Sequence, residues 1–303
     1  MSTQYLRFSA RTAAPQRSSL LERLLAGADG AAAVVDWRND AFRLIAPQSQ
    51  CMPSLGAAAL YASCGAVAAA WAFLATPVHY IVEISNVRMA PHGILSLGLA
   101  DAELLARDFN RVWHDAGLCL KAGTRGELFC LADRPMPAAT RDPENALDRH
   151  IENFLPSGAD SAGPRRLMSE IEMWLFDHTV NRNRIAAGAP AVNGLWLWGG
   201  GAPLTSMPPV TGWAAGSDPF FGSFANEMAP QEERPGVIVL AAEPGTEAWG
   251  EAETRWLAPA VDGLRSGRLS RLELSAGNRS FSVSARWSRR FWRRRHPWWE
   301  FYA

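Results

Sequence analysis

The sequence of 303 residues contains little that points to metal chemistry or to a charged partner. Its four cysteines form no C-x-x-C pair, and Cys119 and Cys130 stand among apolar residues, as buried thiols do in a reducing compartment. The 30 basic and 30 acidic residues give a formal net charge of zero. No global field therefore draws the protein to nucleic acid or to a membrane, and only a local patch could do so.

A secretory signal and a membrane span are also not expected. The first 19 residues lack the apolar core of a secretory signal and are expected to form a loose arm with one short strand. Residues 55–75 are uncharged and long enough to cross a bilayer, but nearly half of them are alanine, which drives insertion poorly. We expect a buried helix here that is broken or loosened at Gly65. We also expect the protein to be cytoplasmic.

Hydrophobic periodicity predicts an α/β protein. Strands separated by helices of ten residues or more favour a largely parallel sheet with helices on both faces. A short buried strand is predicted at 31–36, and strand hairpins at 118–133 and 269–287. The predicted organisation is an N-terminal α/β portion at 1–133, a linker or excursion rich in Pro, Asp, Ser and Gly at 134–165, and a C-terminal α/β portion with a basic aromatic tail at 166–303.

The run NGLWLWGGG at 193–201 has two interpretations. Its leucines and tryptophans alternate, so both faces of a strand would be apolar, as in a central strand covered by helices. The glycines would then permit a tight exit or a close backbone approach. Alternatively, Gly199 and Gly201 belong to a loop that faces a ligand. A phosphate loop would need a helix directly after the glycines, and the Ala-Pro-Leu-Thr-Ser-Met-Pro-Pro that follows cannot start one cleanly.

The segment DHTVNRNR at 177–184 is the main ligand-binding candidate. It follows a predicted helix, and Arg182 and Arg184 could clamp an anion beside His178 and Asn181. Alternatively, the histidine and the arginines bind the last carbonyl groups of the preceding helix. The pattern is compatible with both.

Two other polar features favour structural roles. His79 lies between apolar residues of a predicted strand, where a histidine usually bonds to the backbone. Four glutamates gather at the start of a predicted helix, and favourable interaction with the helix dipole explains them without a metal. They are Glu243, Glu247, Glu251 and Glu253.

The C-terminal tail, residues 285–303, carries six arginines and four tryptophans but one acidic residue. It could dock on the protein itself or on a partner protein, grip nucleic acid, or lie on an anionic membrane surface. The small number of arginines and the neutral body favour self-docking or a protein partner over nucleic acid. If 289–295 is helical, Pro297 should end that helix at about Arg295.

Two segments resemble known families. The runs LADAELLARDFNRVW and FDHTVNRNRIAAGAPAVNGLWLWGGGAP resemble the bacterial RpfE-type regulatory proteins and, more distantly, the archaeal-type cofactor-independent phosphoglycerate mutases. In those mutases an N-x-x-R-x-x-x-G segment precedes a tryptophan-rich strand that ends in W-G-x-G. The matching residues here are Asn181, Arg184 and Gly188 for the first part, and Trp198, Gly199 and Gly201 for the second.

The mutase resemblance implies an abbreviated alkaline-phosphatase-like α/β fold, in which two metal ions held by Asp and His activate a serine. The sequence departs from the metal motifs. DWRND at 36–40 replaces a D-G-x-x-D motif, EPGTEAW at 243–249 replaces a D-x-x-x-H-x-x-H motif, and no histidine lies between His178 and His296. Two-metal phosphoryl transfer would therefore lack its usual carboxylate and imidazole ligands.

Two functions are compatible with these features. The first is a non-catalytic regulatory protein on a degenerate mutase-like fold, without metal or cofactor, whose protein partner contacts the C-terminal tail. The second is a phosphotransferase or phosphatase-type enzyme that acts on a small phosphorylated metabolite at a rearranged site of Asp36, His178 and Arg184. No nucleophile with an adjacent base can be named from the sequence.

Overall fold

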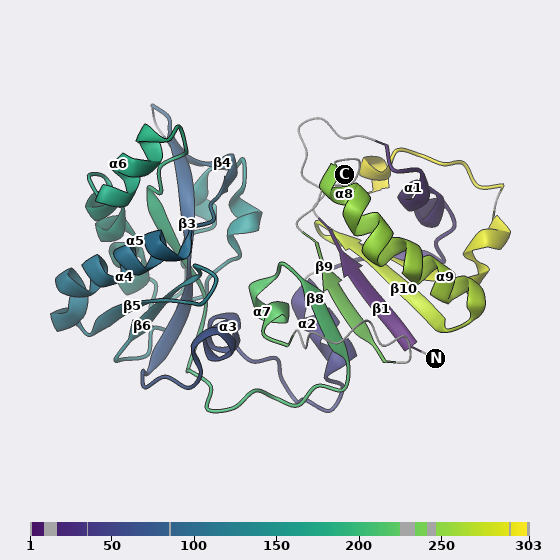
Figure 1. The fold of residues 1–303 in the computed structure, drawn as a ribbon, viewed down its shortest axis with the longest axis horizontal. Coiled ribbons are helices and arrows are strands. Elements are labelled where there is room, and N and C mark those ends of the chain that lie inside the picture. Colours follow the sequence, from purple (N-terminus) through teal and green to yellow (C-terminus); the bar gives the residue numbers. More distant parts are fainter. Residues whose placement is uncertain are drawn as a thin grey trace. The chain divides into compact units, whose positions relative to one another are not determined.

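The computed structural model describes residues 2–8, 17–34, 36–84, 86–224, 234–240, 247–290 and 292–301. The chain forms two compact units, shown in Figure 1. Unit 1 combines Met1–Met52 with Pro208–Ala303, and unit 2 is Pro53–Met207. The predicted divisions at 133 and 165 do not coincide with these units, because both positions lie within unit 2.

Unit 1 is built on a six-stranded mixed sheet of order β2-β11-β10-β1-β9-β8. Its strands are β1 (Ser2–Arg7), β2 (Gly30–Ala33), β8 (Trp213–Gly216), β9 (Gly236–Val239), β10 (Leu269–Ala276) and β11 (Arg279–Ser284). Strand β1 pairs in parallel with β10 and β9, and β8 pairs in parallel with β9. Strand β11 is antiparallel to β10, as the predicted hairpin requires, and β2 is antiparallel to β11.

The helices of unit 1 flank this sheet, and α8 and α9 cross the face that is turned to the viewer in Figure 1. The helices are α1 (Ser19–Ala26), α2 (Trp37–Ile45), α7 (Pro219–Gly222), α8 (Glu247–Ala252) and α9 (Ala258–Ser266). Leu6 of β1 and Leu272 and Leu274 of β10 are fully buried in one cluster with the leucines of α1. Burial of each such side chain contributes about 1.5–3 kcal/mol to folding.

The predicted buried strand at 31–36 is wrong in both extent and burial. Strand β2 ends at Ala33, and all of its residues are exposed because it is the outermost strand of the sheet. Asp36 caps α2 instead, and its carboxylate accepts a hydrogen bond from the backbone N–H of Asn39 at 3.1 Å. The alanine run resembles a core strand in hydropathy, but it has no large side chain to bury.

Unit 2 contains a second sheet, and every pairing in it is antiparallel. Its strands are β3 (Trp71–Val82), β4 (Val87–Ile94), β5 (Leu118–Ala122), β6 (Leu128–Ala132) and β7 (Gly194–Gly201). The expectation of a largely parallel sheet is therefore wrong for this unit. Short connections join β3 to β4 and β5 to β6, and such connections produce antiparallel neighbours. The chain as a whole is a mixed α/β protein.

The helices of unit 2 pack on its sheet and on one another. They are α3 (Leu55–Cys64), α4 (Leu99–Trp113), α5 (Ala162–Leu175) and α6 (Thr179–Ala186). Trp113 of α4 stacks on Phe109 with ring centroids 4.3 Å apart and meets the edge of Trp174 of α5 at 5.4 Å. These aromatic contacts hold α4 against α5.

The uncharged run at 55–75 forms two elements. Helix α3 ends at Cys64, Gly65 follows with a positive φ of 73°, and β3 begins at Trp71. Among the described residues, no helix is long and apolar enough to cross a membrane. Gly56 lies so close to the sheet that an added Cβ would be 2.9 Å from the backbone nitrogen of Leu74 and 3.0 Å from the carbonyl oxygen of Ala72.

Substitution at Gly56 tests this close packing. Alanine favours a helix over glycine by about 1 kcal/mol, but the overpacking at Gly56 costs about 1–3 kcal/mol and outweighs that gain. Gly56→Ala should therefore destabilise the protein in urea unfolding. Gly250→Ala on exposed α8 is the matched control, because nothing lies within 4 Å of its added Cβ, and it should be neutral or stabilising. Equal effects at the two positions would contradict the packing described here.

Candidate functional site

The predicted ligand-binding segment at 177–184 forms the junction between α5 and α6. His178 is buried at this junction and caps α6: its Nδ1 accepts a hydrogen bond from the backbone N–H of Val180 at 3.2 Å. Its Nε2 lies 3.4 Å from Oδ2 of Asp108. Burial lowers the pKa of His178, and the carboxylate of Asp108 opposes that shift. With Nδ1 as acceptor, the neutral imidazole carries its proton on Nε2, facing Asp108.

Asn181 is 3% exposed and connects two segments of unit 2. Its Nδ2 donates to the carbonyl oxygens of Leu175 and Val192, both at 2.7 Å. Its Oδ1 accepts from the backbone N–H of Val192 at 2.8 Å. Leu175 is the last residue of α5, so Asn181, and not the histidine or the arginines as in the alternative interpretation, is the side chain of this segment that binds the end of the preceding helix.

The two arginines do not form a common anion clamp. Arg182 donates to the backbone oxygen of Asp177 at 2.9 Å and to its carboxylate at 3.0 Å, and also to the hydroxyl of Thr179. Arg184 donates from Nε to the carbonyl oxygen of Pro190 at 2.8 Å. Residues two positions apart on a helix point in different directions. Each guanidinium therefore holds its own stretch of backbone.

The glycines after the tryptophans bring β7 close to the start of α3. Gly199 has a φ of 63° and donates its N–H to the hydroxyl of Thr140 at 3.0 Å. A Cβ at Gly201 would lie 2.2 Å from Oγ of Ser54. The predicted buried strand with a tight exit is thus confirmed, although among the described strands β7 pairs only with β3. It is a buried outer strand rather than a central one.

Asp36 does not belong to the same unit as the other candidates. It lies in unit 1, where it is exposed and caps α2. Unit 2 contains His178, Asn181, Arg182 and Arg184, with the first three at the start of α6 and Arg184 in its last turn. The rearranged site of Asp36, His178 and Arg184 thus combines residues from separate units.

The other two polar features also take part in hydrogen bonds of the fold. Nδ1 of His79 lies 2.8 Å from the carbonyl oxygen of Ala191, which confirms the predicted backbone bond. The carboxylate of Glu253 accepts hydrogen bonds from the hydroxyl of Ser18 at 2.9 Å and from the indole N–H of Trp249 at 2.9 Å. Residues 243–246, and with them Glu243, lie outside the described part of the chain.

Sequence reasoning missed a polar cluster at the carboxyl edge of the parallel strands of unit 1, the edge where α/β proteins commonly bind ligands. The carboxyl-edge cluster comprises Arg7, Trp37, Arg38, Asp218 and Ser275, each less than a tenth exposed. The guanidinium carbons of Arg7 and Arg38 lie 4.3 and 4.4 Å from the centroid of the Trp37 ring. No local spacing could indicate this cluster, because its members are brought together only by the sheet.

The polar groups of this cluster bind one another. Arg38 donates from Nε and Nη2 to Oδ2 of Asp218, at 3.0 and 2.8 Å. Oδ1 of Asp218 accepts from the first backbone N–H groups of α7. Arg7 donates to the hydroxyl of Ser275 at 3.1 Å. Within the described ranges, no group of three or more His, Cys, Asp or Glu residues could hold a metal ion.

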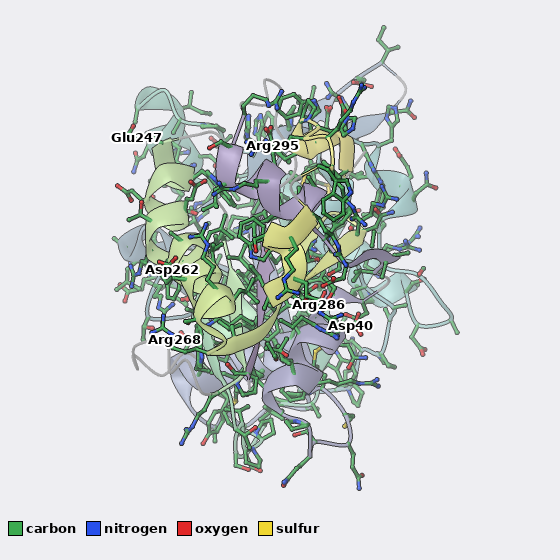
Figure 2. The ribbon with its side chains drawn as sticks, turned by 90° about the vertical axis from the view of Figure 1, so that its right-hand side faces the viewer. Asp40, Glu247, Asp262, Arg268, Arg286 and Arg295 are labelled. Atoms are coloured by element: carbon green, nitrogen blue, oxygen red, sulfur yellow. The ribbon has the colours of Figure 1, made fainter. Side chains whose placement is uncertain are left out.

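The C-terminal tail docks on unit 1. Trp287 is 3% exposed and Trp298 is fully buried in the core of the unit. Arg290 donates to the carbonyl oxygen of Gly27 at 2.9 Å, and Arg293 donates to that of Ala28 at 2.9 Å. These carbonyls lie at the end of α1, where a cation is favoured by the helix dipole. Figure 2 shows this unit with Arg286 and Arg295 labelled on the tail.

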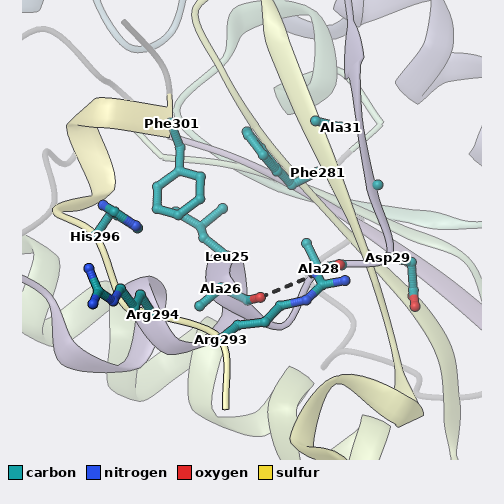
Figure 3. Close-up of a pocket in the computed structure, with 11 residues that line it drawn as sticks. Leu25, Ala26, Ala28, Asp29, Ala31, Phe281, Arg293, Arg294, His296 and Phe301 are labelled. Atoms are coloured by element: carbon teal, nitrogen blue, oxygen red, sulfur yellow. Dashed lines mark hydrogen bonds between the residues drawn. The ribbon is translucent and has the colours of Figure 1, made fainter. Parts of the chain in front are cut away.

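The described residues of 289–295 do not form the conditional helix. A 3-10 helix covers Ala285–Arg290, another covers Trp298–Phe301, and Phe291 lies outside the described residues. Between the two, the chain turns so that Arg293 reaches α1. A pocket of about 360 Å³ lies among the tail, the end of α1, β2 and β11, and Figure 3 shows its lining.

Comparison with known proteins gives one sequence relationship of note. No family model matches the chain. A stretch of 71 residues, 23% of the chain, is 35% identical to a 2,3-bisphosphoglycerate-independent phosphoglycerate mutase from Methanothrix thermoacetophila. The chain is distantly similar to these mutases. The match spans 18% of that mutase, less than a fifth of its length.

Two solved structures show weak overall similarity. A cofactor-independent phosphoglycerate mutase from Thermoplasma acidophilum gives a TM-score of 0.35 at 13% identity, over 93% of this chain and 89% of that one. A protein from Pyrococcus horikoshii gives a TM-score of 0.37 at 11% identity, over 93% and 87% of the two chains. Scores of this size do not establish a common fold.

Removal of the Asn181 amide tests its structural role. Asn181→Ala leaves the carbonyl group and the N–H of Val192 buried without their side-chain partner, whereas the carbonyl oxygen of Leu175 keeps the N–H of His178 as a donor. Each such group costs about 1–3 kcal/mol, so a loss of about 2–4 kcal/mol is expected in urea unfolding. Asn183→Ala on the exposed side of the same helix should change stability by less than about 0.5 kcal/mol. A small effect at Asn181 would contradict this assignment.

Proposed function

We propose that the chain is a non-catalytic regulatory protein on a degenerate phosphoglycerate-mutase-like fold. The observation that carries this proposal is that the predicted site residues form hydrogen bonds and close contacts within unit 2. Asn181 and Arg184, which match the mutase pattern, donate to carbonyl groups of their own unit. The backbone at Gly199 and Gly201 packs closely against the start of α3.

The chemistry of the available side chains supports the same proposal. Two-metal phosphoryl transfer requires carboxylates and imidazoles clustered around both ions. The sequence has no histidine between His178 and His296, and His178 is engaged in capping α6. The carboxyl-edge cluster of unit 1 offers one carboxylate, Asp218, and that group is paired with Arg38. These side chains are suited to stabilising the fold.

The regulatory part of the proposal rests on the resemblance to RpfE-type proteins and on the basic aromatic tail. A regulatory protein acts through a partner, and the docked tail still presents exposed arginines on unit 1. A protein partner that contacts this tail is therefore part of the proposed function.

Metal content and turnover of the purified chain test the proposal. After incubation with manganese or zinc and removal of excess ion, bound metal should be well below one per chain. Neither interconversion of 2- and 3-phosphoglycerate nor hydrolysis of p-nitrophenyl phosphate should exceed that of a blank. Stoichiometric metal together with turnover that Arg184→Ala abolishes would instead establish an enzyme acting on a small phosphorylated metabolite.

A further inference from the structure

We infer that the outer edge of β2, together with the adjacent pocket, binds an extended acidic segment of a partner protein as an added strand. This inference rests on the proposed function only in taking the partner to be a protein. The β2 edge is defined here as the side of Gly30–Ala33 that faces away from β11. The basic rim is defined as Arg293, Arg294 and His296, which line the pocket beside it.

Apart from its short length, the β2 edge has, among the described residues, none of the features by which proteins usually protect an outer strand. Such strands carry charged side chains or proline, contain bulges, or are covered by another element. Strand β2 is Gly-Ala-Ala-Ala, all four residues are exposed, and among the described strands it pairs only with β11. An edge of this kind is a template for strand addition.

The register determines which backbone groups are available at this edge. Val34 donates its N–H to the carbonyl oxygen of Asn278 at 2.7 Å, and the pairing continues as Ala32 with Ser280 and Gly30 with Ser282. Residues of an antiparallel pair alternate between bonding to the partner and pointing away from it. The N–H and C=O groups of Ala31 and Ala33 therefore point outward, where an added strand would bind.

The pocket lies on the face of the sheet to which Ala31 directs its side chain. Ala31 is opposite Phe281 of β11, and both residues line the pocket. Phe301 of the tail meets Phe281 edge to face with ring centroids 5.6 Å apart, as Figure 3 shows. Directly paired residues of neighbouring strands project to the same face. A side chain of an added strand opposite Ala31 would therefore project beside this pocket.

The charge around the pocket favours an acidic segment. Asp29 is the acidic residue of the lining, and Arg290 is paired with it at 2.7 Å. His296 lies 3.2 Å from the carboxylate of Glu300. Arg293 binds the end of α1, and Arg294 is exposed and has no carboxylate partner within the described ranges. The rim thus has an excess of positive charge, and a carboxylate on the added strand would compensate it.

The same charge disfavours a second copy of the chain as the occupant. Two β2 edges paired about a two-fold axis would bring two basic rims toward each other, and like charges across an interface are unfavourable. A nucleic acid would contact the basic rim but would not form strand hydrogen bonds with the backbone groups of Ala31 and Ala33. An acidic peptide uses both features.

Fluorescence anisotropy with a labelled Glu-Val-Glu-Val-Glu-Val peptide tests the inference on the full chain. We expect saturable binding, and binding of the Lys-Val-Lys-Val-Lys-Val peptide should be at least about tenfold weaker. Arg294→Glu should weaken binding of the acidic peptide at least about tenfold, whereas Arg286→Glu, which makes the same charge change away from the pocket, should alter it less than about threefold.

A backbone variant separates strand addition from simple charge attraction. Ala31→Pro removes an outward N–H and leaves the hydrogen bonds to β11 in place, so it should weaken binding at least about tenfold while circular dichroism stays unchanged. If Ala31→Pro does not fold, added peptide should still slow hydrogen exchange at Ala31 and Ala33 of the unaltered chain.

Three results would overturn the inference. The first is equal binding of the two peptides. The second is binding that Ala31→Pro leaves unchanged and that heparin abolishes, which would indicate a polyanion site. The third is concentration-dependent dimerisation that Ala31→Pro abolishes, which would assign the edge to a second copy. None of these results bears on metal content or turnover, so the proposed function stands or falls separately.

Discussion

A helix leaves its last carbonyl groups without hydrogen-bond donors from its own backbone. The structure of both units depends on which groups donate to these carbonyls. In unit 2, Asn181 donates to the carbonyl oxygen of Leu175 at the end of α5 and ties it to the segment that leads into β7. In unit 1, Arg290 donates to the carbonyl oxygen of Gly27, the residue after α1, and Arg293 donates to those of Ala26 and Ala28. In each case a polar side chain from a later segment closes a helix, and that segment is thereby fixed in place.

This use of polar side chains bears directly on function. Groups that satisfy buried backbone atoms cannot leave them without a cost of about 1–3 kcal/mol for each group. Asn181, which matches the mutase pattern, holds buried backbone groups of unit 2 in this way. In unit 1 the same principle docks the tail, because its arginines bind α1 while Trp298 enters the core. The docked tail in turn supplies part of the lining of the pocket beside β2.

Local patterns in the sequence predicted local structure well. The hairpins β5–β6 and β10–β11 follow from alternating residues about short turns, and α4 follows from its apolar periodicity. Strand direction and order depend on contacts between distant segments, so the antiparallel sheet of unit 2 and the central position of β1 could not be predicted. The pairing of Arg38 with Asp218 spans 180 positions and has no local signal. For DHTVNRNR the pattern left two roles open, because only the fold places the carbonyl groups of Leu175 and Val192 beside Asn181.

The proposed function requires that this segment serve the fold and not a ligand. Hydrogen exchange followed by mass spectrometry, with and without saturating 3-phosphoglycerate, tests it most directly. We expect the amides of residues 175–192 to be protected already in the free protein, because Asn181 holds both ends of that stretch. We also expect the phosphorylated compound to change their exchange by no more than inorganic sulfate does. Slower exchange at 177–184 that is specific to 3-phosphoglycerate would contradict the proposed function.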